Sequence, residues 1–188
     1  MQALLAVSRA IDAVTRFIGY NIRWLVLVTV AVSTFNALNR KFFDSSSNSW
    51  LESQWLMFGA VFMLAAAYVL QKNAHVRIDV VSSRLSRSAR NWIDLLCHLF
   101  MLAPLTIVMM KLSWPFFLGS FLDNETSSNA GGLPVWPSKL FVFTGFLLLF
   151  IQMLSEVIKR IAVMTGDLHE EDPHGQHSEL AGVEEMKP

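Results

Sequence analysis

Four polar residues near the C-terminal end of a long apolar stretch have a spacing suited to chemistry on a helix. They lie at i, i+3, i+4 and i+7, so they share one helical face: Gln152, Ser155, Glu156 and Lys159. An ionisable residue within such a stretch is a candidate for proton transfer or for an ion pair. Glu156 precedes Lys159 by three residues and Arg160 by four, which is the favourable order for a helical pair. We therefore favour the ion pair.

A haem or metal site would need several ligands at one depth, and the histidines do not provide them. His98 is the only histidine within an apolar stretch, so a haem with two axial histidines would lack its second ligand. His75 lies in a basic connection, and the other histidines are irregularly spaced near the C-terminus, which is a weak metal pattern. We identify no nucleophile with its base, no phosphate-binding glycine pattern and no second cysteine beside Cys97. The sequence therefore predicts no enzyme, no cofactor and no metal site.

The composition places these residues in a membrane. Of the 188 residues, 53% are hydrophobic and only 16% are charged, which is too apolar for a typical soluble domain. A helix needs about 20 apolar residues to cross a bilayer. Four stretches approach that length: residues 22–38, 55–70, 92–122 and 140–158. The sequence thus predicts an all-α integral membrane protein whose four transmembrane helices form one domain, residues 21–162.

The two ends of the chain differ from this transmembrane domain. In residues 1–20, Arg9, Asp12 and Arg16 lie away from an apolar stripe with helical spacing. The stripe consists of Leu4, Val7, Ile11, Val14 and Ile18. We interpret this segment as an amphipathic helix at the membrane interface. Residues 163–188 are acidic and nearly free of large apolar side chains, so they are predicted to form a disordered tail.

The basic residues predict the orientation in the membrane. Residues 71–96, which join the second and third spans, contain five of the chain's 15 Lys and Arg. With a cytoplasmic N-terminus, eleven of the 15 face the cytoplasm and four face outward: Arg40, Lys41, Lys111 and Lys139. The positive-inside rule expects this bias, so both termini are predicted to be cytoplasmic. The formal net charge is zero, which gives no indication of a nucleic-acid partner.

Two polar faces at membrane depth are predicted to point away from lipid. One is the face that contains Gln152 and Glu156, and the other is formed by Ser33, Asn36 and Arg40 on the first span. Such faces can pack within the chain or against another membrane subunit. The sequence leaves both possibilities open.

Two further sets of charged residues are candidates for contacts with a partner or with lipid. Arg40 and Glu52 flank the connection between the first two spans, and we expect each to meet an opposite charge, either in the other residue or on a partner. His75, Arg77 and Asp79 lie in the basic connection, where an arginine can bind lipid phosphate and an aspartate can cap the following helix. We expect Arg77 and Asp79 to hold this turn in the shape that a partner or lipids require.

The same connection carries a resemblance to a known family. The sequence MLAAAYVLQKNAHVRIDVVSSRLSRSARNWIDLL runs from the end of one span through His75, Val76, Arg77 and Asp79 into a span that contains tryptophan. It resembles the small membrane subunit, the Q or DctQ-like subunit, of tripartite ATP-independent periplasmic (TRAP) transporters. The order of the four spans and the stretches NRKFFDSSSNSWLESQWLMF and GGLPVWPSK agree with this, so the resemblance covers roughly residues 20–162.

The resemblance implies a secondary transporter of the bacterial inner membrane. In that family a periplasmic protein binds the substrate, commonly an organic acid, and a large membrane subunit moves it with a sodium gradient. The small subunit widens the fixed scaffold of the large subunit and has no substrate site of its own. The expected partners are therefore the large subunit, the periplasmic binding protein and membrane lipids. Two alternatives stay open: a membrane anchor of a respiratory haem or quinone enzyme, and a stand-alone four-helix exporter.

Overall fold

The structure, a computed structural model, describes residues 2–44, 47–72 and 87–167. Within these ranges the chain is helical and has no strand; the helices are α1 (Gln2–Phe43), α2 (Asn48–Gln71), α4 (Arg87–Cys97), a π-helix (His98–Leu102), α5 (Ala103–Leu122) and α6 (Trp136–Met164). Four helical segments are long and apolar enough to cross a membrane: α1, α2, Asn91–Leu122 and α6. The predicted fold class, an all-α membrane protein with four spans, is confirmed. Most of the basic connection and of the predicted tail lies outside the described residues.

The first helix is longer than a membrane span. α1 has 42 residues, which corresponds to about 63 Å at 1.5 Å per residue. The segment predicted as an interfacial helix is helical, but it continues into the first span without a break. Proline, which would interrupt it, is absent, and Gly19 packs so closely against Tyr68 of α2 that a Cβ would not fit. The predicted interfacial helix and the predicted first span are therefore one helix, which packs against α2 and α6.

The N-terminal half of α1 turns a small polar face toward the other helices. Ser8 and Thr15 are buried on this face, at 2% and 4% exposure. Leu4, Val7 and Val14 of the predicted apolar stripe are more than half exposed. The stripe is thus directed away from the interior of the protein, as expected for a helix whose surroundings are partly lipid.

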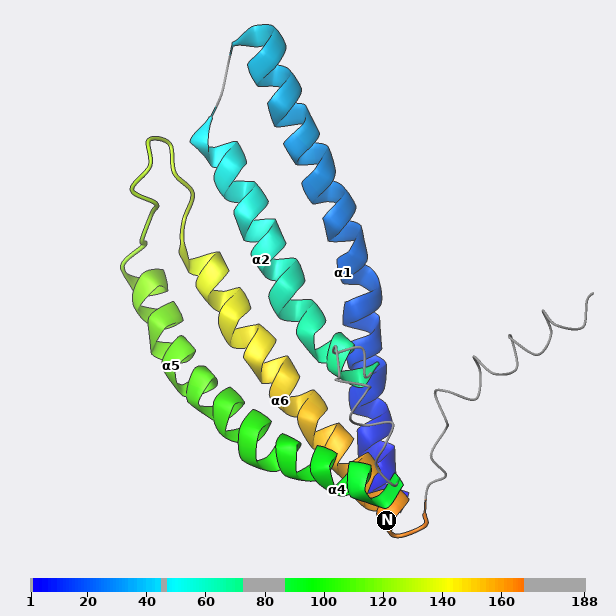
Figure 1. The fold of residues 1–188 in the computed structure, drawn as a ribbon. Helices are drawn as coiled ribbons and strands as arrows, with labels where there is room; N and C mark the ends of the chain where they lie inside the picture. Colours follow the sequence, from blue (N-terminus) through cyan, green and yellow to red (C-terminus); the bar gives the residue numbers. More distant parts are fainter. Residues whose placement is uncertain (1, 45–46, 73–86, 168–188) are drawn as a thin grey trace, which may run out of the picture.

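The third span is interrupted by a π-helical turn. Pro104 lies at the start of α5, and a proline has no N–H with which to bond the carbonyl four residues earlier. In the turn before it, Ala103 donates to the carbonyl of His98, five residues earlier, which widens the helix locally. α4 and α5 together form an arc along the flank of the protein (Figure 1). A π-turn beside a proline is a usual cause of such bending.

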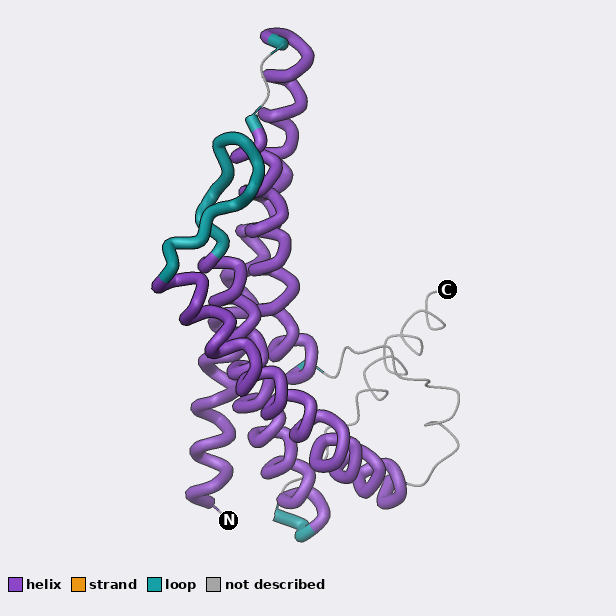
Figure 2. The backbone as a smooth tube through the Cα atoms, turned by 90° about the vertical axis from the view of Figure 1, so that its left-hand side faces the viewer, coloured by secondary structure: helices purple, strands orange, loops and turns teal. Residues whose placement is uncertain are grey.

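The helices form one layer in the order α5, α6, α2, α1 (Figure 1). In the view at a right angle to this, the helices largely overlap (Figure 2). The layer is fan-shaped, because α1 and α4 each contact α6 at the end that carries the N-terminus, whereas α1 and α5 lie far apart at the other end. We call these the convergent end and the divergent end.

Few apolar side chains are buried in the described part of the chain: Ala60, Ala67, Leu70, Met153 and Ala162. α2 and α6 approach closely at Gly145, where a Cβ would lie 2.8 Å from the backbone oxygen of Met63. Contact through small residues is typical of membrane helices, because lipid gives no drive to bury large side chains. The broad faces of the layer carry exposed large side chains, among them Trp55 and Phe62 at 70% and 71% exposure. These faces are available to lipid and to other subunits.

Candidate functional site

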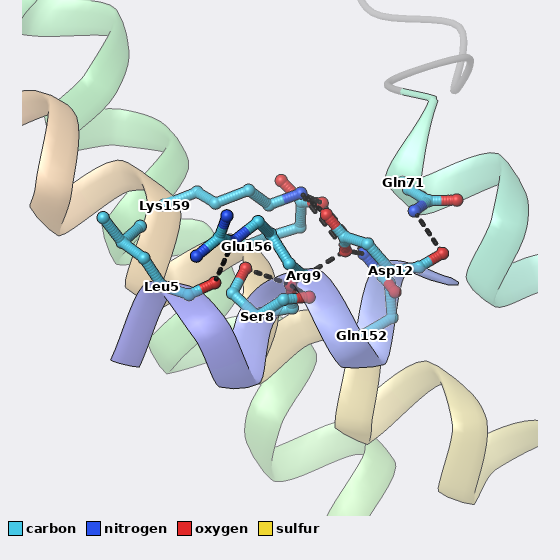
Figure 3. A network of polar contacts seen from close by, with 9 residues as sticks. Leu5, Ser8, Arg9, Asp12, Gln71, Gln152, Glu156 and Lys159 are labelled. Carbon is cyan, nitrogen blue, oxygen red and sulfur yellow. Dashed lines mark hydrogen bonds and ion pairs between the residues drawn. The ribbon is translucent and has the colours of Figure 1, made fainter. Parts of the chain in front are cut away.

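Lys159 of α6 is the centre of a polar cluster at the convergent end (Figure 3). Its ammonium nitrogen lies 3.1 Å from Asp12 Oδ2 of α1 and also contacts Glu156 on the preceding turn. Gln152 donates from Nε2 to Asp12 Oδ1 at 2.8 Å and to Glu156 Oε1 at 3.0 Å, and Ser155 donates to Asp12 Oδ1 at 2.9 Å. We call this set the ion-pair network: Ser8, Asp12, Gln152, Ser155, Glu156 and Lys159.

Helical spacing explains how two helices build this network. Ser8 and Asp12 are four residues apart on α1, so they face α6 together, and the hydroxyl oxygen of Ser8 lies 2.7 Å from that of Ser155. Gln71, at the end of α2, donates to the backbone oxygen of Asp12 at 2.8 Å. Asp12 therefore joins α1, α2 and α6 at one level. One ammonium group serves two carboxylates, and the amide of Gln152 donates to both, which reduces their mutual repulsion.

The residue after Lys159 attaches α4 to α6 in the same way. Arg160 lies 3.1 Å from Asp94 Oδ2 and donates to Asn91 Oδ1 at 2.8 Å, and both partners belong to α4. Its side chain is only 11% exposed. The sequence predicted that Glu156 would pair with Lys159 or Arg160, and the structure pairs it with Lys159. Two consecutive basic residues thus connect α6 to helices on either side of it.

Of the two polar faces that the sequence left open, one packs within the chain and the other does so in part. Gln152 and Glu156 are buried, at 0% and 6% exposure, against α1. On the other face, Ser33 donates to Oε1 of Gln54 of α2 at 2.8 Å and Asn36 is buried at 8% exposure. Arg40 of that face is exposed near the end of α1. The geometry therefore favours helix packing over docking for Gln152 and Glu156.

At the divergent end, Glu52 of α2 holds the connection between α5 and α6. Its Oε1 accepts from the hydroxyl of Ser127 and, at 2.7 Å, from Asn129 Nδ2, while its Oε2 accepts from the backbone N–H of Leu133 at 2.7 Å. Ser49 and Asn48, one turn earlier, donate to the backbone carbonyls of residues 131 and 130. We call this arrangement, residues 48, 49 and 52 with residues 127–133, the loop clamp.

Glu52 and Arg40 were expected to meet each other or an opposite charge on a partner. Among the described residues no ion pair joins the two, and both carboxylate oxygens of Glu52 accept from the loop. An opposite charge on a partner stays a prediction. The loop itself is tightly formed: Gly131 has φ +70°, and a Cβ on Gly132 would lie 2.6 Å from Ser127 Cβ. Substitution of either glycine would disturb the clamp.

An ion pair joins the beginning of this loop to α6. Lys139 contacts Glu125, whose side chain is 44% exposed. The hydrogen bond from Lys139 lowers the pKa of the Glu125 carboxyl below its ordinary value. The pair therefore favours the charged carboxylate and holds the loop close to the start of α6.

A cavity of about 340 Å³ opens beside the loop clamp. Its walls are mostly apolar and come from α2, α6 and the loop, including Trp55, Met63 and Phe141. Among the described residues that line it there is no lysine or arginine, and the carboxylate of Glu52 is directed to the loop. This lining offers no cationic group to an organic anion.

Other predicted residues are accounted for individually. His98 is buried, and its Nδ1 contacts the carbonyl oxygen of Asp94. His75, Arg77 and Asp79 lie outside the described residues, so their role stays a prediction.

Sequence reasoning missed several residues that the structure places in these sites. Asp12 was assigned to the face of α1 that also carries Arg9 and Arg16, and its central position in the ion-pair network was not foreseen. The i, i+4 pair of Ser8 and Asp12 was a usable signal, because it parallels the polar face of α6. Asp94 of the α4 contact had no such signal in the sequence.

The comparison with family models decides what kind of protein this is. The model of the DctQ component of tripartite ATP-independent periplasmic transporters matches residues 29–163, which is more than half of the chain. The chain belongs to this family. The predicted resemblance is thus confirmed, and this DctQ component is a multi-pass inner-membrane protein and part of a transporter. Searches of curated proteins and of solved structures found no significant match.

The matched range divides the ion-pair network of this DctQ component. Gln152, Glu156 and Lys159 lie within residues 29–163, whereas Ser8 and Asp12 precede it. The loop clamp lies entirely within the range. The N-terminal part of α1 therefore supplies contacts that the family match does not cover.

Proposed function

We propose that this DctQ component is the small scaffold subunit of a sodium-driven transporter for organic acids. It would dock to the large membrane subunit, widen the fixed part of that subunit and have no substrate site of its own. The observation that carries this proposal is the single layer of helices with two broad apolar faces. The polar side chains of the ion-pair network and of the loop clamp bind groups within the chain. No lysine or arginine is among the described residues that line the cavity. Such a layer is suited to supporting a second membrane protein.

The transport chemistry of this proposal is taken from the family. Sodium coupling, organic-acid substrates and a periplasmic substrate-binding protein are properties of TRAP transporters, and we extend them to this chain as part of the proposal. The alternative of a haem or quinone anchor has less support, because His98 is the only histidine within an apolar stretch and a haem with two axial histidines would lack its second ligand. The large subunit and the binding protein are the expected partners, together with lipids.

We further propose that the convergent end faces the cytoplasm. The support is the excess of Lys and Arg on the side that the sequence predicts to be cytoplasmic. Of these residues, Arg9 and Lys159 lie at the convergent end (Figure 3). The loop clamp would then face the periplasm. A reporter that is active only in the periplasm should stay silent when fused after Arg90 and become active when fused near Ser127. The reverse pattern would reject this orientation.

Co-purification tests the scaffold role. The large subunit of the same transporter, co-expressed with the tagged chain, should be retained on affinity resin, and substrate uptake in cells should require both. Purified chain with a Soret band would support the haem alternative. Transport by this chain alone in liposomes would support an exporter. Either result, or a large subunit that is not retained, would contradict the proposal.

Two sets of residues are proposed to contact the large subunit or its lipids. Arg40 is exposed in the last turn of α1 and is suited to an acidic partner. Arg77 and Asp79, with His75, are proposed to shape the basic connection. Neutralising Arg77 should lower the yield of the complex more than neutralising Arg84, and equal small effects would show that the connection contributes bulk charge alone.

A further inference from the structure

Three arginines repeat at intervals of seven residues along α1. Arg9, Arg16 and Arg23 are all exposed. An interval of seven residues turns an α-helix to within about 20° of the same direction, so they form one basic stripe. α1 is the last helix of the layer (Figure 1). Arg9 and Arg16 each follow a buried residue of the packed face by one position, so the stripe lies roughly a quarter turn from that face, on a flank of α1. Within the described residues, no ion pair involves any of the three, whereas Lys139, Lys159 and Arg160 each contact a carboxylate.

Contacts with α2 give the depth of the stripe. Gly19 lies against Tyr68, and the backbone oxygen of Asp12 accepts from Gln71 at the end of α2. Arg16 therefore lies level with the end of the apolar part of α2. Arg23 lies about 6 Å further than Gly19 toward the divergent end, at 1.5 Å per residue. It is thus at a depth where a guanidinium group is costly without a partner.

The side chains are directed back toward the N-terminal end of α1. The guanidinium carbon of Arg23 lies 3.4 Å from the ring centroid of Tyr20, which is one turn earlier. Arg9 likewise donates to the carbonyl of Leu5, four residues earlier, at 3.3 Å. A ring face attracts the cation of Arg23 but accepts few of its five N–H donors. The remaining donors therefore point toward the membrane surface at the convergent end.

We propose that the stripe at Arg16, Tyr20 and Arg23 binds the phosphate of an anionic phospholipid in the leaflet at the convergent end. Guanidinium groups bind phosphate oxygens through paired hydrogen bonds, and Tyr20 holds one such group in place. The α-carbons of Arg16 and Arg23 lie about 10 Å apart along the helix, so Arg16 lies at the membrane surface and Arg23 lies below it. The long side chain of Arg23 can extend toward the surface, so that both guanidinium groups reach the same head group.

Two observations favour lipid over a protein partner as the occupant. The contacts with α2 place Arg16 level with the end of the apolar part of α2, which is the depth of lipid head groups. The stripe also precedes residues 29–163, the range shared with the family, so a docking surface common to the family does not require it. A cytoplasmic leaflet, which is anionic, would provide the matching charge.

Lipid binding to the full purified chain tests the proposal. Native mass spectrometry would compare phosphatidylglycerol with phosphatidylcholine for the wild type and for the double variant Arg16→Gln/Arg23→Gln. The wild type should prefer phosphatidylglycerol by about 30-fold, because each basic side chain near the anionic group contributes roughly fivefold. The variant should lose most of this preference, and Arg23→Lys should retain part of it.

The matched control removes the same charge at exposed positions outside the stripe. Lys41→Gln/Lys111→Gln should keep the preference for phosphatidylglycerol. An equal loss in both double variants, or no loss in either, would overturn the proposal. A third outcome would also overturn it: the wild type shows no lipid preference, and the Arg16→Gln/Arg23→Gln variant no longer binds the large subunit. The occupant of the stripe would then be a protein. The measurement does not depend on orientation, so its failure is distinct from that of the reporter test. Unchanged thermal unfolding in zwitterionic detergent would show that the variants are folded.

Discussion

The ion-pair network and the loop clamp both connect segments that are distant in the sequence, but they use different physical means. The network joins helices through charged side chains that are largely buried: Asp12, Glu156 and Lys159 are 16%, 8% and 25% exposed. The clamp uses one carboxylate, Glu52, to hold the hydroxyl, amide and backbone N–H groups of a surface loop. A buried charge that loses its partner is far more costly than an exposed hydrogen bond that water can replace.

This difference suggests a division of roles. The network lies where α1, α2 and α6 meet, so it sets the angle at which the fan opens. The clamp lies where the helices diverge, so it shapes the surface between them. We expect variants of the network to affect the stability of the whole layer, and variants of the clamp to affect one loop.

The largest effect is expected for Lys159→Met. This change leaves the carboxylates of Asp12 and Glu156 together without their shared cation, which should lower the free energy of unfolding by about 3 kcal/mol. Reversible unfolding in mixed micelles would measure it. Lys111→Met, at an exposed position of α5, is the control and should change stability by less than about 0.5 kcal/mol.

A double variant sharpens this test. Adding Asp12→Asn to Lys159→Met removes one of the two carboxylates and should recover part of the loss. If the two changes are simply additive, the charges of the network are not coupled and the comparison with the clamp fails.

A smaller effect is expected for Arg160→Gln, which removes the contact with Asp94 and α4. The loss should be about 2 kcal/mol, since hydrogen bonds to charged groups contribute roughly 1.5–3 kcal/mol. Amide hydrogen exchange should increase in α4 more than in α1. Arg160→Lys keeps the charge without the planar fork and should be intermediate. Faster exchange in α1 alone would contradict this assignment.

The clamp should respond locally to Glu52→Gln. The amide replaces one acceptor oxygen with a donor that faces other donors, so the loop should be released at a cost of about 1–2 kcal/mol. Proteolysis within residues 123–135 should become faster while unfolding of the helices is little changed. Asp123→Asn, in the same loop, is the control. Global destabilisation by Glu52→Gln would mean that the clamp and the network have the same role.

The smallest effect concerns the pH dependence of the Glu125 contact. Its pKa is lowered, so the pair contributes fully above the ordinary value of 4.5 and is lost as the pH falls through the lower folded pKa. Side-chain NMR of Glu125 should therefore give a midpoint below 4.5. Lys139→Met should move the midpoint back toward 4.5. An unchanged midpoint in that variant would exclude Lys139 as the cause.

The sequence by itself determined the class of the protein, its four spans and the polar face of α6. Hydrophobic length and helical period are local properties of the chain, so they can be read without knowing the neighbours. The family resemblance was also readable, because its motifs are short and contiguous. For the same reason the pairing of Glu156 with Lys159, three residues apart, was predicted correctly.

Only the tertiary structure decided which faces meet. Ser8 and Ser155 are 147 positions apart, and a helical period gives the direction of a side chain but not the helix that lies opposite it. Arg40 and Glu52 were expected to meet each other or a charged partner because they flank one connection, yet Glu52 accepts from Ser127, which lies 75 positions later. The continuity of α1 was likewise decided by its contacts with α2 and α6. Helix packing depends on the shape and charge of distant segments, and this is the physical reason why the network and the clamp could not be foreseen.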